Sequence, residues 1–169
     1  MKNNKTNTFE YFYQTKDHSL SVPEERKRIL NTKLAEITPI LDHNTNKPIG
    51  PDRIFKKGGN GPGLMMSRTI GDLEGHELGI IATPDVNELI LDFGEYVVIS
   101  ASDGLWDKVK YEKIIEIINQ YYLCQNVKKI LDDLLTEAKK EWRNTDDVID
   151  DITIAVVLLS NVQIKKMIN

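Results

Sequence analysis

Hydrophobic and polar positions follow two different periods along this chain, and the changes of period divide it into elements. The segments 9–14 (FEYFYQ), 79–91 (GIIATPDVNELIL) and 95–102 (EYVVISAS) are rich in aromatic and β-branched residues and are bounded by turn residues, which predicts strands. The segment 23–37 opens with Pro23 and two glutamates, which favours a first helical turn. A short, mostly exposed helix is therefore predicted there.

Two longer helices are predicted in the second half of the chain, where apolar residues recur at helical spacing. The first has an apolar face made of Ile114, Ile115, Ile118, Tyr121 and Tyr122. The second has one made of Val127, Ile130, Leu131, Leu134, Leu135, Ala138 and Trp142. The last element, 151–160 (DITIAVVLLS), is apolar in both alternations, which predicts a strand covered on both faces. Strands near both ends with helices between them indicate a layered α+β fold.

The periodicity is lost between residues 41 and 63, where Gly, Pro, Asn and Asp dominate the segment LDHNTNKPIGPDRIFKKGGNGPG. This composition predicts a long loop or a flap. The whole chain has 169 residues, of which 40% are hydrophobic, and this is enough for one domain with a core. We therefore expect a single domain over 1–169 that contains the loop.

The charge and the cysteine content argue against a nucleic-acid-binding protein and against a disulfide-stabilised protein. The formal net charge is −4 and the isoelectric point is about 5.4, so there is no broad basic field and a nucleic acid partner is not expected. The single cysteine, Cys124, excludes a disulfide framework and fits a reducing compartment. The polar opening MKNNKTNT and the lack of a stretch of membrane-spanning length predict a soluble intracellular protein, cytoplasmic or nuclear, without a membrane partner.

Acidic residues stand at complementary ends of the two most apolar strands. Asp103 directly follows the strand in 95–102, and Asp150 directly precedes the segment 151–160, whose first residue is Asp151. If these strands are antiparallel neighbours, the end of one lies beside the start of the other. Asp103 and Asp150 would then face each other at one edge of the sheet.

Two interpretations of these acids remain open from the pattern alone. Carboxylates held close together repel unless a proton or a cation lies between them, and sites made only of oxygen ligands favour Mg²⁺ or Mn²⁺. In the alternative interpretation Asp103 and Gly104 form an ordinary turn, and the acids before the last strand are a stop signal.

Six segments, in order along the chain, resemble motifs of the protein phosphatase 2C family, the metal-dependent serine/threonine phosphatases. The segment ISASDGLWDKV (99–109) is similar to the family's SDG(L/I)WD motif. The others are TKDHS (15–19), PEERKRI (23–29), LMMSRTIGD (64–72), IIATPDV (80–86) and DDITIAVV (150–157). The resemblance implies a layered β-sandwich flanked by helices, with metal ions at one end of the sandwich.

The resemblance also implies roles for individual residues. Asp103 and Asp150 match two ligands of one ion of a binuclear centre, and Asp17 matches a ligand of a weaker third ion. Arg68 and Asp72 match positions with an architectural role. The implied reaction is hydrolysis of phosphoserine and phosphothreonine in a protein substrate by a water that Mg²⁺ or Mn²⁺ activates, without a protein nucleophile.

The chain lacks the first part of the family's pattern. The DGHGG segment, whose aspartate bridges the two ions in the family, is absent, as are the arginine and the acidic pair that precede it. The chain therefore resembles the C-terminal portion of the catalytic domain with the N-terminal strands missing, and we expect little or no activity from it alone. A missing N-terminal half is an expected partner.

Three hypotheses follow for the function. The chain is the C-terminal portion of a phosphatase 2C enzyme, a non-catalytic phosphatase-like interaction domain, or a structural or metal-binding domain whose motifs are coincidental. Because retained acids such as Asp17, Asp103 and Asp150 are costly at a site without function, they favour the first hypothesis.

Overall fold

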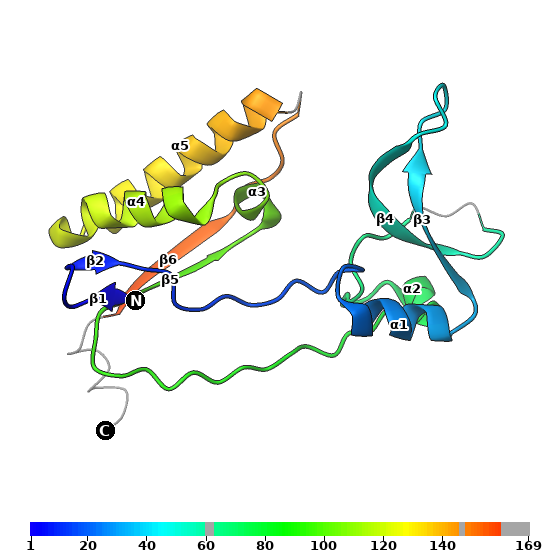
Figure 1. Cartoon of the computed structure of the whole chain (residues 1–169), viewed down its shortest axis with the longest axis horizontal. Helices are drawn as coiled ribbons and strands as arrows, with labels where there is room; N and C mark the ends of the chain where they lie inside the picture. The colour runs from blue at the N-terminus through cyan, green and yellow to red at the C-terminus, as the bar shows by residue number, and fades with distance from the viewer. Residues whose placement is uncertain (60–62, 146–147, 160–169) are drawn as a thin grey trace. The chain divides into compact units, whose positions relative to one another are not determined.

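Two units with separate cores make up the part of the chain that the computed structural model describes, residues 1–59, 63–145 and 148–159. The first unit contains Met1–Tyr13 and the chain from Leu89 onward, and the second contains Gln14–Glu88 (Figure 1). The arrangement of helices and strands matches the predicted α+β class. No helix within the described ranges is both long enough and apolar enough to cross a membrane.

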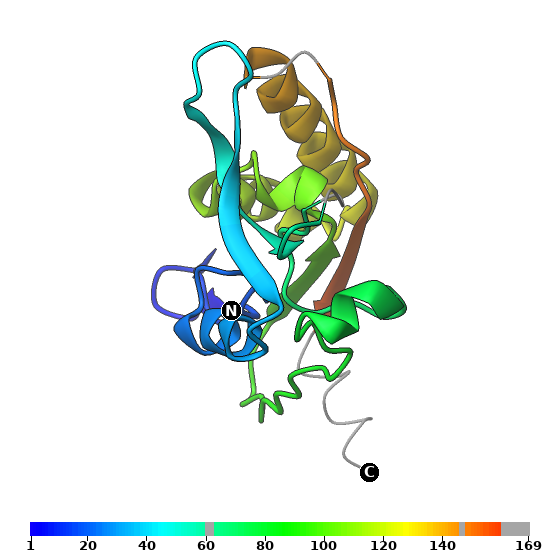
Figure 2. The same ribbon diagram turned by 90° about the vertical axis from the view of Figure 1, so that its right-hand side faces the viewer.

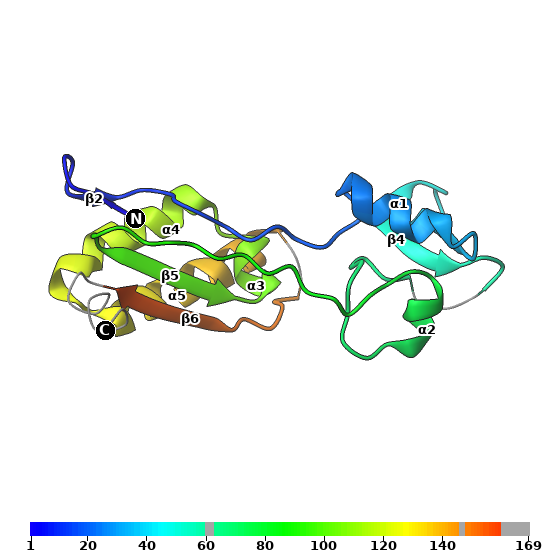
Figure 3. The same cartoon turned by 90° about the horizontal axis from the view of Figure 1, so that it is seen from below.

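The first unit is built on an antiparallel pair of strands, β5 (Tyr96–Ala101) and β6 (Ile154–Leu159). Their register runs from Tyr96 opposite Leu159 to Ala101 opposite Ile154. The two strands are therefore antiparallel neighbours, which is the condition under which Asp103 and Asp150 were expected at one edge of the sheet. Helices α4 (Tyr111–Tyr121) and α5 (Val127–Thr145) lie together on one face of this pair, as Figures 1 and 3 show.

Short elements complete the first unit. Helix α3 (Asp103–Trp106) follows β5, and the 3₁₀ helix η1 (Tyr122–Cys124) joins α4 to α5. Near the N-terminus, β1 (Lys2–Asn3) pairs with β2 (Thr8–Phe9), and the ring of Phe9 packs edge-on against Tyr122 with the ring centroids 4.4 Å apart. The N-terminal segment is thereby attached to the helical layer.

The core of the first unit lies between the helices and the sheet. The side chains of Leu105, Ile130 and Leu134 have no solvent exposure, and alternate residues of β5 and β6 pack against the same cluster. The apolar spacing that predicted α4 and α5 therefore creates this core, and both predicted helices are confirmed. On α4, Ile117 is buried while the predicted Ile115 is only half-buried.

The prediction for the last strand is wrong in two respects. Strand β6 begins at Ile154, three residues after the start of the predicted segment, whose last residue, 160, lies outside the described residues. Among the described residues, side chains pack on only one face of β6. Val157 keeps 51% of its surface exposed and Ala155 is also exposed, because the helices cover only the other face. The apolar sequence of β6 is therefore that of a two-sided strand, although only one side is packed.

The second unit packs helix α1 (Pro23–Asn31) against a hairpin of β3 (Ala35–Leu41) and β4 (Pro48–Lys56). Figure 2 shows the hairpin rising from beside α1, and the five-residue helix α2 (Leu73–Glu77) lies later in the chain. The core consists of six buried residues, Leu20, Ile29, Ala35, Ile54, Leu78 and Ile80.

Two predictions for the second unit are wrong. The helix predicted over 23–37 ends at Asn31, and Lys33 takes a left-handed conformation (φ 60°) that turns the chain into β3. The segment 41–63, predicted as a long loop or a flap, contains the whole of β4, because pairing with β3 gives this polar segment the hydrogen bonds that its composition does not suggest. A loop is therefore wrong over Pro48–Lys56, and the flap stays a prediction. Only residues 60–62 of that segment lie outside the described residues.

Two predicted strands are also absent where expected. Over 9–14 only Phe9 lies in a strand, and over 79–91 there is one isolated bridge, between Ile81 and Arg68. Both segments have strand-like composition, but a strand forms only where another strand supplies hydrogen-bond partners. In the described part of the chain, these two segments have no such neighbour.

Truncating Leu134 to alanine should destabilise the first unit by about 3 kcal/mol, because the change removes a fully buried side chain and leaves a cavity between α5 and the sheet. Urea denaturation followed by circular dichroism measures this loss. Leu123→Ala is the matched control, since Leu123 is 71% exposed and its truncation should leave the denaturation midpoint almost unchanged. Equal effects of the two changes would contradict the assigned core.

Candidate functional site

The end of β5 and the approach to β6 are joined by hydrogen bonds around Ser102. The main-chain N–H of Ser102 donates to the carbonyl of Thr153 (3.0 Å), and the N–H of Thr153 donates back to the Ser102 hydroxyl oxygen (3.1 Å). The Ser102 hydroxyl donates in turn to the carbonyl of Asp151 (3.0 Å). Asp103, at the start of α3, therefore follows a residue that is fixed to the segment containing Asp150 and Asp151.

Gly104 is required by the closeness of this approach. A Cβ atom at residue 104 would lie 2.4 Å from the carbonyl oxygen of Asp151 and 3.1 Å from Cγ1 of Ile152. No side chain larger than hydrogen fits there without displacing the main chain. The glycine of the DG pair thus allows two segments that are distant in sequence to touch directly beside Asp103.

Two tryptophans hold the turn from the other side. The indole N–H of Trp106 donates to the carbonyl of Ala101 (2.9 Å), and the indole N–H of Trp142 donates to the carbonyl of Gly104 (2.8 Å). The main chain on both sides of Asp103 is therefore fixed by the segment that leads into β6, by α3 and by the last turn of α5.

The carboxylates themselves are accessible to solvent. Asp103, Asp150 and Asp151 are all exposed, and Oδ1 of Asp150 accepts the main-chain N–H of Asp151 (2.8 Å). Carboxylate oxygens are suitable donors for Mg²⁺ or Mn²⁺. The donor chemistry fits such an ion, but in the described ranges no group of three or more acidic, histidine or cysteine side chains is placed to hold a metal.

Asp17, the third predicted ligand, belongs to the second unit and is exposed. Its neighbour His18 is held at two points: Nε2 lies 3.1 Å from Oδ2 of Asp85, and its carbonyl accepts the N–H of Ser67 (2.9 Å). These contacts fix the main chain next to Asp17, although the Asp17 carboxylate itself remains open to solvent.

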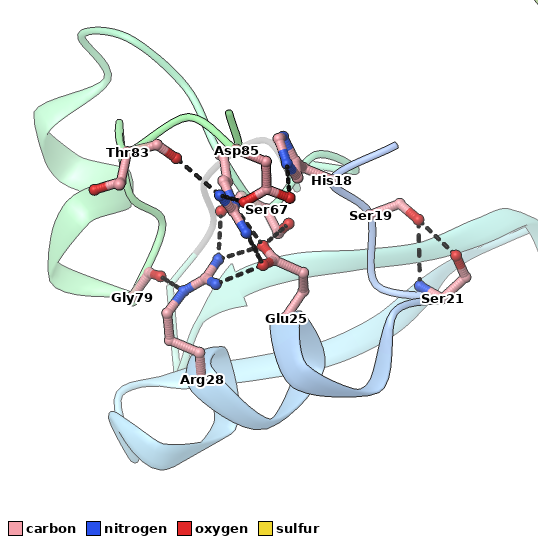
Figure 4. A network of polar contacts seen from close by, with 10 residues as sticks. His18, Ser19, Ser21, Glu25, Arg28, Ser67, Gly79, Thr83 and Asp85 are labelled. Atoms are coloured by element: carbon pink, nitrogen blue, oxygen red, sulfur yellow. Dashed lines mark hydrogen bonds and ion pairs between the residues drawn. The ribbon is translucent and has the colours of Figure 1, made fainter. Parts of the chain in front are cut away.

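A buried carboxylate, Glu25, organises the polar network of the second unit. Only 3% of Glu25 is exposed, and its two oxygens accept hydrogen bonds from Arg28 (2.6 and 2.8 Å), from Arg68 (2.6 Å at the shortest) and from the hydroxyl of Ser67 (2.5 Å). In Figure 4, Glu25 and Arg28 reach from α1 toward the segments that carry Ser67 and Gly79. One carboxylate thus connects α1 to two later parts of the chain.

The two arginines extend this network to main-chain carbonyls and to Asp85. Arg28 donates to the carbonyls of Ser67 and Gly79, each at 2.9 Å. Arg68 donates to the carbonyl of Thr83 (2.9 Å) and to Oδ1 of Asp85 (2.8 Å). Since Asp85 also contacts His18, the network runs continuously from α1 to the residue beside Asp17.

The network shifts the pKa values of three of its members, Glu25, Arg68 and Asp85. Hydrogen bonds from Arg28, with further ones from Arg68 and Ser67, hold the pKa of Glu25 far below its ordinary value, although burial acts in the opposite direction. His18 and then Arg68 lower the pKa of Asp85, and Glu25 raises the pKa of Arg68. All these charges are therefore retained at neutral pH.

The burial of Glu25 differs from the mostly exposed helix that the sequence predicts. Glu25, Arg28 and Ile29 share the face that packs into the unit. The spacing in the sequence contains a signal for this burial, because residues four apart lie on the same helical face and Glu25 precedes the fully buried Ile29 by four residues. The architectural role implied for Arg68 agrees with its contacts, and Asp72 takes a left-handed conformation (φ 47°) before α2.

Comparison with known proteins gives a consistent result. The model of the family described as protein phosphatase 2C matches residues 4–147. The chain is 28% identical over 146 residues to "Probable protein phosphatase 2C 73" of Arabidopsis thaliana, and 33% identical over 104 residues to "Probable protein phosphatase 2C 48" of Oryza sativa subsp. japonica. These matches cover 86% and 62% of this chain respectively.

A solved structure agrees with the sequence matches. The serine-threonine phosphatase 2C from Toxoplasma gondii superposes with a TM-score of 0.65 at 26% identity, over 87% of this chain. The chain covers only 46% of the Toxoplasma protein, and 37% and 28% of the two plant relatives. Less than half of each of these proteins therefore has a counterpart in this chain.

Replacing Gly104 with alanine should destabilise the first unit by about 2 kcal/mol, because the added methyl group would overlap the Asp151 carbonyl and push the end of β5 away from β6. Urea denaturation measures the loss. In the control variant Gly94→Ala, the added methyl would meet only the ring of Tyr96 at 3.3 Å, so a smaller effect is expected. If Gly104→Ala is as stable as the parent, the close approach described here is wrong.

Replacing Glu25 with glutamine should destabilise the second unit by about 3 kcal/mol at pH 7, because two arginines lose their buried carboxylate partner. The exposed Glu24→Gln on the same helical turn is the matched control. Because the pKa of Glu25 is lowered in the folded state, its stabilising contribution is complete above its ordinary value of 4.5 and is lost as the pH falls below that value. Urea midpoints of the parent should therefore approach those of Glu25→Gln in acid; a gap that stays constant down to about pH 3 would contradict this assignment.

Proposed function

Because the chain belongs to the protein phosphatase 2C family, we propose that it is an incomplete catalytic domain of a metal-dependent protein serine/threonine phosphatase. The main support is the hydrogen bonding of Ser102 to Thr153 and Asp151, which places the end of β5 beside the approach to β6. This is the arrangement in which Asp103 and Asp150 can act on the same ligand.

In this proposal Asp103 and Asp150 are ligands of one Mg²⁺ or Mn²⁺ ion, and Asp17 is a ligand of a weaker additional ion. When bound, such ions supply a nucleophilic water and neutralise charge on the phosphoryl oxygens. The chain's own contribution is positional, since the strands, Gly104 and the two tryptophans fix the main chain from which Asp103 extends. The proposed substrate is a protein that carries phosphoserine or phosphothreonine.

We propose that these residues are insufficient without a partner. Two carboxylates hold Mg²⁺ weakly, and the DGHGG segment expected to supply the bridging ligand is not in the sequence. The proposed partner is therefore a polypeptide equivalent to the missing N-terminal half of the domain. The chain alone should have little or no phosphatase activity.

A non-catalytic phosphatase-like interaction domain is the second candidate. The absence, within the described ranges, of three side chains placed to hold a metal supports it. It accounts less well for an exposed Asp103 and Asp150 at a place where hydrogen bonds join β5 and the approach to β6 beyond their ladder. We therefore favour the enzyme.

Hydrolysis of p-nitrophenyl phosphate with Mn²⁺ tests the proposal. The chain alone should hydrolyse it at the background rate, and co-expression with the part of the Toxoplasma gondii phosphatase that this chain does not cover should produce activity. In that complex, Asp103→Ala should reduce turnover by at least about 100-fold, more than changes outside the first ligand sphere cost.

Asp132→Ala is the control for this experiment, since Asp132 lies on the exposed face of α5 and its carboxylate forms an ion pair with Lys128. It should leave turnover unchanged. Full activity of the chain alone, or full activity of the Asp103→Ala complex, would refute the proposed function.

A further inference from the structure

Two leucines near the end of α1 remain open to solvent. Leu30 keeps 46% of its surface exposed, and Leu34, which lies between α1 and β3, keeps 50%. Leu30 lies on the side of α1 away from Glu25 and Arg28, whose side chains point into the second unit in Figure 4. Single exposed leucines are ordinary on protein surfaces, so the importance of these two depends on what surrounds them.

Three lysines lie next to these leucines. The main-chain N–H of Lys33 donates to the carbonyl of Leu30 (3.2 Å), and the N–H of Lys57 donates to the carbonyl of Leu34 (2.9 Å). Lys27 precedes Leu30 by three residues and therefore shares its helical face. We call these five residues, Lys27, Leu30, Lys33, Leu34 and Lys57, the basic corner.

The three lysines of the basic corner are exposed, and within the described ranges none of them forms an ion pair. Glu24, one turn before Lys27 on α1, is also exposed and is not paired with it. Other cations of the second unit already have carboxylate partners: Arg26 pairs with Asp52, Arg28 and Arg68 with Glu25, and Lys56 with Glu77. The charges of the basic corner are therefore available to a ligand.

The basic corner offers two kinds of contact at one place. The leucine side chains can be buried by an apolar group, and the ammonium groups around them can pair with carboxylates. The sign of its charge is opposite to that of the whole chain, whose formal net charge is −4. Clusters of cations recognise acidic motifs in peptides, and apolar anchors add affinity to that recognition. The complementary ligand is thus acidic and apolar at once.

We propose that the basic corner is a docking site for a peptide segment of a partner protein in which apolar side chains are flanked by aspartate or glutamate. The site needs no metal ion and no catalysis, so it is independent of the acids that follow β5 and precede β6. It gives the second unit a binding function of its own, which is to hold a partner through a segment distinct from any reacting group.

Two other occupants fit the basic corner less well. An anionic membrane surface is recognised by clusters of about four to eight basic residues, whereas the corner has three lysines on a chain of net negative charge. A second copy of the chain, related by a two-fold axis, would place the same lysines opposite one another, and their like charges would repel. Charge complementarity therefore favours an acidic peptide.

Fluorescence anisotropy with two labelled synthetic peptides tests the proposal on the full chain. One peptide carries two leucines flanked by glutamates, and in the other lysines replace the glutamates. The acidic peptide should bind with a dissociation constant below about 100 μM, and the lysine peptide should not bind in that range. Raising the ionic strength to about 0.5 M should weaken the binding, because the ion pairs are exposed to screening.

Charge reversal locates the binding on the chain. Lys33→Glu combined with Lys57→Glu should weaken binding of the acidic peptide at least about tenfold, because two attractive pairs become repulsive. Leu30→Ser should weaken it about fivefold through the loss of an apolar contact. The matched control is Lys5→Glu combined with Lys139→Glu, which makes the same change in net charge at exposed lysines of the first unit and should leave the affinity unchanged.

Circular dichroism of each variant should show a retained fold, since every changed side chain is exposed. Equal binding of the two peptides, equal affinity of the parent and the charge-reversed corner, or no binding up to about 100 μM would overturn the proposal. So would a dimer that the reversal dissociates, or binding to phosphatidylserine vesicles that the reversal abolishes and the acidic peptide does not compete for. None of these results depends on turnover, so each leaves the proposed function to its own test.

Discussion

The antiparallel pairing of β5 with β6 is the constraint on which the candidate site depends. Their register brings Ala101 opposite Ile154, and beyond that pair Ser102 continues the contact through Thr153 and Asp151. About fifty residues of chain, including both long helices, separate the two strands. Without the pairing, the acids at residues 103 and 150 would have no fixed relationship, and the DG turn would be one of many ordinary turns. Packing and hydrogen bonding in the first unit therefore fix the end of the β5–β6 pair that lies beside Asp103.

The second unit depends on a different interaction, the hydrogen-bond network around the buried carboxylate of Glu25. Its apolar core has only six residues, and much of its internal order comes from Glu25, which two arginines and a serine satisfy completely enough to keep the carboxylate charged while buried. A buried charge is costly unless its hydrogen bonds are complete, so the members of this network depend on one another. The arginines also fix main-chain carbonyls, which gives irregular segments around residues 67, 79 and 83 defined positions without strands or helices.

The parts of the fold that could be predicted from the sequence are those with local causes. Helices α4 and α5 follow from the spacing of their own apolar residues, and the two strands β5 and β6 follow from their composition. The pairing of β5 with β6 was only a condition for bringing the acids at their ends together, and the structure meets it. The hairpin of β3 and β4 could not be predicted from composition, because Pro48, Gly50 and Asp52 become strand residues only through their partner strand. The burial of Glu25 was missed for a related reason, since its partners Ser67 and Arg68 lie more than forty residues away. For the segments 9–14 and 79–91 the prediction is wrong in the opposite way, because strands are predicted and almost none are present. Their composition favours strands, but the described part of the chain offers them no neighbouring strand.

The hydrogen bond from Trp142 to the carbonyl of Gly104 connects helix α5 to the turn that carries Asp103. Helix α5 extends over 19 residues, and its indole contact lies in its final turn, far along the axis from the junction with η1. A small change in helix tilt would be magnified along that length and delivered to the main chain beside Asp103. Changes on the surface of α5 that alter its orientation would therefore also alter the main chain beside Asp103, even where the changed residues lie far from it.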